Sequence, residues 1–288
     1  MRTVTVATTQ MSCSWNIDEN IAKAEGLIYQ ASAQGAQIVL LQELFETPYF
    51  CQQELAKFFN FASTLEENKA VKHFQQIARK LEIVLPISFF EKKNQAHYNS
   101  LAVIDITGEI LGVYRKSHIP DGPGYEEKYY FNPGDTGFKV FKTKYGTLGI
   151  GICWDQWYPE TARCLAILGA ELLFYPTAIG SEPTNATFDS KNHWQRCMQG
   201  HAAANIMPVI AANRVGIEDI EGSQITFYGS SFITDPEGEI IVAADRQKET
   251  VLVAKFDLDA IALKRAAWGI FRDRRPDLYS PILTYAGN

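Results

Sequence analysis

Helical and strand-like patterns alternate along the whole chain, and this alternation limits the fold more than any other feature of the sequence. Residues 3–11 alternate like a strand, residues 17–34 have the apolar spacing of an amphipathic helix, and residues 37–41 form a short apolar strand. No linker rich in Pro, Gly or Ser, no charge block and no internal repeat interrupts this order. We therefore expect a single α/β domain over residues 1–288, ending in an irregular tail at about residues 268–288.

Local signals place some of the boundaries within this domain. The pattern Ser63-x-x-Glu66 is typical of a capping box, and it predicts a helix that reaches about Leu81. A run of strand patterns between residues 82 and 152 indicates a mixed sheet. The turn sequence Asp-Pro-Glu-Gly predicts a hairpin that joins strands at 224–234 and 239–243.

Composition excludes several classes of function. Lys and Arg total 27 against 33 Asp and Glu, so the net charge of -6 argues against a nucleic-acid partner and suits a small cationic substrate. No apolar run approaches the ~18 residues of a membrane span. The odd number of cysteines, five, and an N-terminus without an apolar block predict a reduced, cytoplasmic protein. Because neither C-x-x-C nor H-E-x-x-H spacing occurs, we expect no metal site.

The segment from Gly149 to Glu160 is the most informative for chemistry. A strand ends there, Cys153 follows two glycines, and a helix is predicted to begin near Pro159. A cysteine at such a turn faces a cleft, where backbone N–H groups can stabilise an oxyanion. The alternative is a buried cysteine that packs as a small apolar residue. We keep that alternative for the other four, Cys13, Cys51, Cys164 and Cys197.

Two further charged residues stand at predicted strand ends. Glu43 comes just after an apolar strand, and Lys116 ends another strand pattern. A nucleophilic cysteine needs a base, and no histidine lies in the segment around Cys153. From spacing alone, however, a solvated side chain at the end of a strand is the favoured interpretation of each charge.

Taken together, Glu43, Lys116 and Cys153 resemble the Glu-Lys-Cys triad of the nitrilase (carbon–nitrogen hydrolase) superfamily. Five segments in register carry this resemblance: Leu40–Leu44, Tyr114–Ile119, Glu127–Gly134, Gly151–Asp155 and Phe271–Pro276. The resemblance implies that Cys153 is the nucleophile and Glu43 its base. It also implies that Lys116 favours the thiolate and stabilises the oxyanion, and that Glu127 orients Lys116 or the substrate.

The resemblance further implies an architecture. We expect an αββα sandwich that forms four layers, in a single carbon–nitrogen hydrolase domain over residues 1–288. The domain is expected to self-associate through its helices into a homo-oligomer, with the tail at about 268–288 packed on a partner subunit. No metal or organic cofactor is implied.

Three segments are most similar to the branch of this family that acts on carbamoylated diamines: Ser117–Tyr125, Tyr175–Pro183 and His193–His201. The implied reaction converts N-carbamoylputrescine into putrescine, carbon dioxide and ammonia. We assign Glu182 to the terminal ammonium of this cationic ureido substrate, since a buried ammonium needs an anion. Tyr49 and Trp154 are expected to be walls of the pocket. Alternatively, Glu182 is a solvated loop acid and the two aromatic residues only pack.

Other functions remain open at this stage. The substrate could be a nitrile, an ω-amide or a carbamoyl amino acid, or the fold could serve a non-catalytic binding protein. A carbamoyl amino acid would need a cation for its carboxylate, and residues 177–189 contain Glu182 and Asp189 but neither Arg nor Lys. If Glu182 does not contact the amine, Asp155 or Asp189 is the next candidate.

Overall fold

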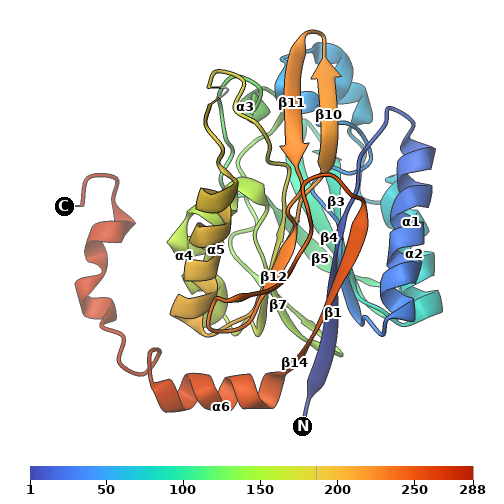
Figure 1. Cartoon of the computed structure of the whole chain (residues 1–288). Helices are drawn as coiled ribbons and strands as arrows, with labels where there is room; N and C mark the ends of the chain where they lie inside the picture. The colour runs from blue at the N-terminus through green and yellow to red at the C-terminus, as the bar shows by residue number, and fades with distance from the viewer. Residues whose placement is uncertain (186, 288) are drawn as a thin grey trace.

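Two sheets lie face to face between two pairs of helices in the computed structural model, which describes residues 1–185 and 187–287 (Figure 1). The first sheet contains β1 (Thr3–Gln10), β2 (Ile38–Leu40), β3 (Leu85–Lys93), β4 (Ala96–Ile104), β5 (Ile110–Arg115) and β14 (Thr250–Asp257). β1 pairs with β14 and β2, and a backbone bridge between Ile38 and Val84 joins β2 to the antiparallel strands β3, β4 and β5. The bridge is parallel, and β3, β4 and β5 alternate in direction, so β5 runs in the same direction as β2. Both strands therefore end at the same edge of the sheet.

The second sheet has the strand order β13-β12-β9-β8-β7-β6. Its strands are β6 (Val140–Thr143), β7 (Gly146–Ile150), β8 (Leu172–Pro176), β9 (Val209–Ala212), β12 (Phe232–Thr234) and β13 (Ile240–Ala243). β7, β8 and β9 run parallel, so the segments that follow them leave the sheet at one edge. Ligands commonly bind at the carboxyl ends of parallel strands.

Helices cover the outer face of each sheet (Figure 1). α1 (Ile17–Ala33) and α2 (Lys69–Leu81) pack on the first sheet, and α4 (Pro159–Ile167) and α5 (Lys191–Asn205) pack on the second. A third apolar core, which includes Leu101, Ile150 and Phe174, fills the space between the sheets. This arrangement confirms the expected αββα sandwich and its single domain.

The remaining elements lie at the edges of the sandwich. They are α3 (Glu127–Tyr130), α6 (Leu258–Trp268), the hairpin of β10 (Val215–Ile220) and β11 (Ser223–Tyr228), and 3-10 turns at Phe50–Gln52, Ala56–Phe61, Cys153–Trp157, Pro276–Leu278 and Ser280–Leu283. The chain after α6 extends away from the two sheets (Figure 1). Within residues 1–185 and 187–287, no helix is long and apolar enough to cross a membrane.

Two local predictions are wrong. The capping box at Ser63 does not begin α2, because Asn68 is the N-cap and its side chain accepts a hydrogen bond from the Val71 N–H at 2.8 Å. The backbone of Ser63 instead pairs with the chain near Glu91. The expected strand at 224–234 is also interrupted, because Gly229 and Ser230 both have positive φ and separate β11 from β12.

Candidate active site

Three segments bring a lysine and two glutamates together in the interior. Glu43 follows β2, Lys116 follows β5, and Glu127 begins α3. The Lys116 Nζ donates to Glu43 Oε1 at 2.9 Å and to Glu127 Oε2 at 2.6 Å, and all three side chains are 0% exposed. The ammonium is therefore held between two carboxylates that reach it from different elements.

The two oxygens of Glu43 have different surroundings. Oε1 accepts from Lys116 and also from Asn99 Nδ2, on β4, at 2.6 Å. Oε2 is buried and has no hydrogen-bond partner among the residues that the structure describes. A carboxylate fixed through one oxygen and free at the other is well placed to accept a proton.

Glu127 is fixed from its far side by Tyr49. The Tyr49 hydroxyl donates to Glu127 Oε1 at 2.6 Å, and the ring is fully buried. Tyr49 is absent from the described residues that line the cavity next to Cys153. Tyr49 packs against Tyr125, which lines that cavity, so its role as a wall of the pocket stays a prediction, while its hydroxyl holds a carboxylate.

Burial and charge act in opposite directions on these groups. Burial alone would lower the pKa of Lys116, but the carboxylates of Glu127 and Glu43 raise it well above its ordinary value. The lysine is thus an ammonium. Burial, assisted by the charge of Glu43, raises the pKa of Glu127 to about 7, although Lys116 and the Tyr49 hydroxyl lower it.

Cys153 occupies a strained turn between β7 and α4. It begins the 3-10 turn Cys153–Trp157 with a φ of 44°, a conformation that costs energy in a residue other than glycine. Asp155 holds this turn by accepting from the Ile152 N–H at 2.9 Å. The same carboxylate accepts from the His118 N–H at 3.0 Å, two residues from Lys116. One aspartate therefore ties the cysteine turn to the lysine segment.

Burial and charge also act in opposite directions on Cys153. Burial raises the pKa of the Cys153 thiol well above its ordinary value, and the charge of Glu43 adds to this effect. Lys116 lowers the pKa of the thiol, but it is shared between two carboxylates and does not reverse the shift. The expected influence of Lys116, which favours the thiolate, is therefore present, but burial and the charge of Glu43 act against it and favour the thiol.

A cavity of about 180 Å³ opens from Cys153. Its described lining includes Trp154, which is 37% exposed, and the carboxylates of Asp121 and Glu182, but no Lys or Arg. The structure therefore places Trp154 and Glu182 in one cavity with the cysteine.

Glu182 is the half-buried acid of this cavity. Burial raises the pKa of Glu182, and within residues 1–185 and 187–287 its carboxylate has neither an ion pair nor a side-chain hydrogen bond. The two reserve candidates are engaged elsewhere. Asp155 is fully buried in the cysteine turn, and Asp189 pairs with Arg246 at 2.5 Å.

Sequence reasoning did not single out three residues that shape this site. Asn99 lies within a strand pattern, and Asp155 was considered only as a contact for the amine. Arg214 follows β9 and was not identified. One available signal for Arg214 was its position after a fully apolar strand, since a charge buried there needs a partner.

The described residues contain no group of three or more His, Cys, Asp or Glu side chains arranged to hold a metal ion. The charged groups that act on Cys153 are the carboxylates of Glu43 and Glu127 and the ammonium of Lys116, which are groups of acid–base and acyl-transfer chemistry.

Comparisons with known proteins agree with this geometry. Residues 5–266 match the family Carbon-nitrogen hydrolase. N-carbamoylputrescine amidase of Arabidopsis thaliana is 57% identical, over 100% of this chain and 97% of that protein. Citrullinase of Francisella tularensis subsp. tularensis is 54% identical, over 98% of this chain and 99% of that protein.

Solved structures show the same relationship. The crystal structure of a carbon-nitrogen hydrolase from Helicobacter pylori G27 has a TM-score of 0.93 and 41% identity, covering 98% of this chain and 99% of that one. The resemblance inferred from the sequence motifs is thereby confirmed, and the chain belongs to the carbon–nitrogen hydrolase family.

Proposed function

We propose that this carbon–nitrogen hydrolase converts N-carbamoylputrescine into putrescine, carbon dioxide and ammonia through a covalent intermediate on Cys153. The observation that carries the proposal is one cavity whose lining holds the cysteine and the carboxylate of Glu182, which has no ion pair within the described part of the chain. A ureido group placed at Cys153 would leave the ammonium of the substrate free to contact that carboxylate. Relatives named N-carbamoylputrescine amidase, at 57% identity, support the choice of substrate.

The first step is attack by sulfur on the ureido carbon. Burial favours the thiol form of Cys153, and we propose that its proton leaves as the carbon–sulfur bond forms. We assign that proton to Glu43, whose Oε2 has no other partner among the described residues. General-base catalysis by a positioned carboxylate typically contributes ~10²–10⁴ to the rate.

The negative charge that forms on the ureido oxygen needs donors. Lys116 carries three N–H groups and uses two of them for Glu43 and Glu127, which leaves one for the oxyanion. The backbone N–H of Trp154 is in the first turn of a short 3-10 helix, where N–H groups have no intrahelical acceptor. We assign these two donors to the oxyanion.

The intermediate then breaks its bond to the terminal nitrogen. Glu43 returns the proton, ammonia leaves, and the chain carries a thiocarbamate on Cys153. Water, deprotonated by Glu43, attacks the same carbon and releases the thiol together with an N-substituted carbamic acid. That acid decomposes to the amine and carbon dioxide, so the overall reaction consumes water and needs no redox partner.

Citrulline is the second candidate substrate, because Citrullinase is 54% identical. Citrulline carries the same ureido group, but its far end bears a carboxylate in addition to an ammonium. The described lining of the cavity holds Asp121 and Glu182 and no Lys or Arg. A carboxylate placed among these acids would be repelled, so the lining favours the diamine derivative.

Ammonia release separates these functions. We expect kcat/KM for N-carbamoylputrescine to exceed the values for citrulline, ω-amides and nitriles. A preference for citrulline would reverse the proposed choice, and release of ammonia from none of these compounds would refute the proposed function.

We also propose that the protein is a cytoplasmic homo-oligomer. All five cysteines are free, as a reducing compartment favours. Exposed apolar side chains lie along α6 and the chain that follows it, among them Leu263, Trp268, Leu283 and Tyr285. A second copy is expected to cover this surface, with the tail at about 268–288 packed on the partner. Light scattering should give a mass above the 32.3 kDa of one chain. Removal of residues 270–288 should reduce the number of chains in the assembly.

A further inference from the structure

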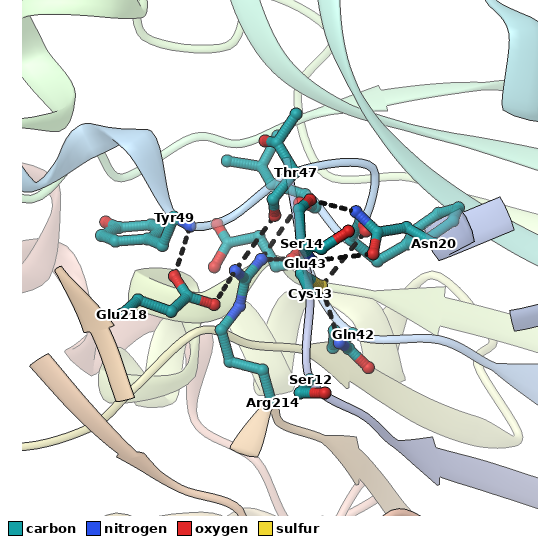
Figure 2. A network of polar contacts seen from close by, with 12 residues as sticks. Ser12, Cys13, Ser14, Asn20, Gln42, Glu43, Thr47, Tyr49, Arg214 and Glu218 are labelled. Carbon is teal, nitrogen blue, oxygen red and sulfur yellow. Dashed lines mark hydrogen bonds and ion pairs between the residues drawn. The ribbon is translucent and has the colours of Figure 1, made fainter. Parts of the chain in front are cut away.

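Arg214 is a buried arginine that joins the two sheets at the candidate active site (Figure 2). It follows β9 of the second sheet, and its guanidinium reaches the chain that follows β2 of the first sheet. Its Nη2 donates to the carbonyl oxygens of Glu43 at 2.8 Å and Leu44 at 3.0 Å, and its Nη1 donates to the carbonyl of Thr47 at 3.2 Å. The guanidinium therefore fixes the backbone of Glu43 through its carbonyl oxygen. Among the described residues, it makes no hydrogen bond to the Glu43 carboxylate.

Glu218, on β10, completes this arrangement (Figure 2). One of its oxygens accepts from Arg214 Nη1 at 2.9 Å, and the other accepts from the Tyr49 N–H at 2.6 Å. The Tyr49 hydroxyl in turn donates to Glu127 at 2.6 Å. The Arg214–Glu218 pair thus reaches Glu43 through the backbone and Glu127 through Tyr49.

The backbone held by Arg214 is strained. Leu44 has a φ of 47°, which a leucine rarely adopts. Its N–H donates to the Ser88 hydroxyl at 3.0 Å, while its carbonyl accepts from Arg214. Strained residues persist only where surrounding contacts fix them, and such residues concentrate at functional sites. The residue after Glu43 is therefore fixed at both of its polar groups.

We propose that the Arg214–Glu218 pair is a positioning unit that sets Glu43 and Glu127 at their distances from Lys116 and Cys153. This inference rests on the proposed role of Glu43 as the base. A lysine at position 214 keeps the charge but cannot donate to four separate acceptors through a planar fork. The Glu43 backbone would then relax, and a misplacement of about 1 Å in a reacting group can cost about 10²-fold in rate.

The test compares Arg214→Lys, Glu43→Gln and the double variant by two readouts. The first is kcat and KM for N-carbamoylputrescine, and the second is the rate at which iodoacetamide alkylates Cys153, followed by peptide mass spectrometry. We expect Arg214→Lys to lower kcat about 10²-fold with KM little changed, and to slow alkylation. In the Glu43→Gln background, Arg214→Lys should slow alkylation no further, because the base through which it acts is already absent.

Arg265→Lys is the matched control, because Arg265 donates to the carbonyls of Ile206 and Ala170, away from this site. We expect wild-type alkylation from it. Glu218→Gln removes the paired charge with little change of shape, and it provides the same test if Arg214→Lys does not fold.

Three results would overturn the positioning role: an effect no larger than that of Arg265→Lys, an effect on KM alone, or the same slowing with and without Glu43. Alkylation needs no substrate, so it still tests the positioning role if wild-type protein proves inactive on N-carbamoylputrescine, a result that would refute only the proposed substrate.

Discussion

The two ends of the candidate site are built differently. At one end, Lys116, Glu43 and Glu127 are fully buried and joined by hydrogen bonds of 2.6–2.9 Å. At the other end, Glu182 is only half-buried and has no ion pair among the residues that the structure describes. At the first end each charge has a partner of opposite sign without a ligand, whereas among the described residues the carboxylate of Glu182 has none.

This difference separates the reaction from the choice of substrate. A buried charged network tolerates little change, because removal of one partner leaves another charge buried and unpaired. An acid that is unpaired in the free protein gains its partner only when a cationic substrate binds. We therefore expect substitutions at the first end to affect every substrate, and substitutions at the second to affect cationic substrates alone.

The largest expected effect concerns Cys153. Cys153→Ala removes the nucleophile, so turnover should fall by at least about 10⁴-fold for charged and uncharged ureido compounds alike, in a protein that still folds. The measurement is ammonia release, with circular dichroism to confirm folding. Cys164→Ala is the control, because Cys164 lies on α4 outside the cavity. Near-wild-type activity of Cys153→Ala would rule out the covalent route.

Lys116→Met is expected to damage both activity and stability. It leaves two carboxylates buried side by side without their shared cation, and breaking a buried pair typically costs about 3–5 kcal/mol of unfolding free energy. Loss of an oxyanion donor should also lower kcat about 10²–10³-fold. Urea unfolding and ammonia release measure the two effects. Lys142→Met, at an exposed position on β6, should change neither, and equal stability of the two variants would contradict the buried network.

Glu182→Gln, unlike Lys116→Met, should lower activity on the cationic substrate without lowering stability. It keeps the shape of the side chain and removes its charge, so kcat/KM for N-carbamoylputrescine should fall roughly 30-fold to several thousand-fold, the range for losing one member of a charge pair. Stability should hardly change, because no cation pairs with Glu182 among the described residues.

An uncharged N-carbamoyl alkylamine of equal length provides the internal comparison for Glu182→Gln, and its turnover should be little affected. Asp189→Asn is the matched control for Glu182→Gln. It removes an acid in the same loop that already pairs with Arg246. If both substrates lost rate equally in Glu182→Gln, the glutamate would be structural. The two ends of the site would then not be separable.

The alternation of helix and strand patterns predicted an α/β domain, and the resemblance of five segments to the carbon–nitrogen hydrolase family implied the sandwich that the structure shows. Apolar periodicity located α5 at Lys191–Asn205, and the resemblance to the family's motifs singled out Glu43, Lys116 and Cys153 as candidate site residues. What the sequence did not predict depends on contacts between distant segments. The hydrogen bond from Tyr49 to Glu127 joins residues 78 apart, and that from Arg214 to Glu43 joins residues 171 apart. No local pattern indicates such pairs, so the contact between Tyr49 and Glu127 and the position of Arg214 were not predicted.

Tyr49→Phe gives the smallest expected effect. It tests whether the protonation state of Glu127, at the first end of the site, controls turnover. The Tyr49 hydroxyl stabilises the Glu127 carboxylate and so lowers its pKa, which burial and the charge of Glu43 have raised to about 7. Glu127 must be ionised to hold Lys116 firmly, so activity should rise as the pH increases through about 7. Removing the hydroxyl raises the pKa of Glu127 further. The rise of activity with pH, which is the acid limb of the profile, therefore moves to higher pH.

A hydrogen bond to a charged group contributes about 1.5–3 kcal/mol, so the midpoint of the kcat profile should move upward by about one pH unit or more. At a pH well above both midpoints, where Glu127 is ionised in both proteins, kcat should nearly coincide with that of the wild type. Tyr145→Phe is the control, because the Tyr145 hydroxyl donates to the Glu82 carbonyl far from the site, and it should leave the profile unchanged. An acid limb that stays in place in Tyr49→Phe would mean that the proton on Glu127 does not control turnover. In that case, the Tyr49 hydroxyl would only fill space behind the carboxylate.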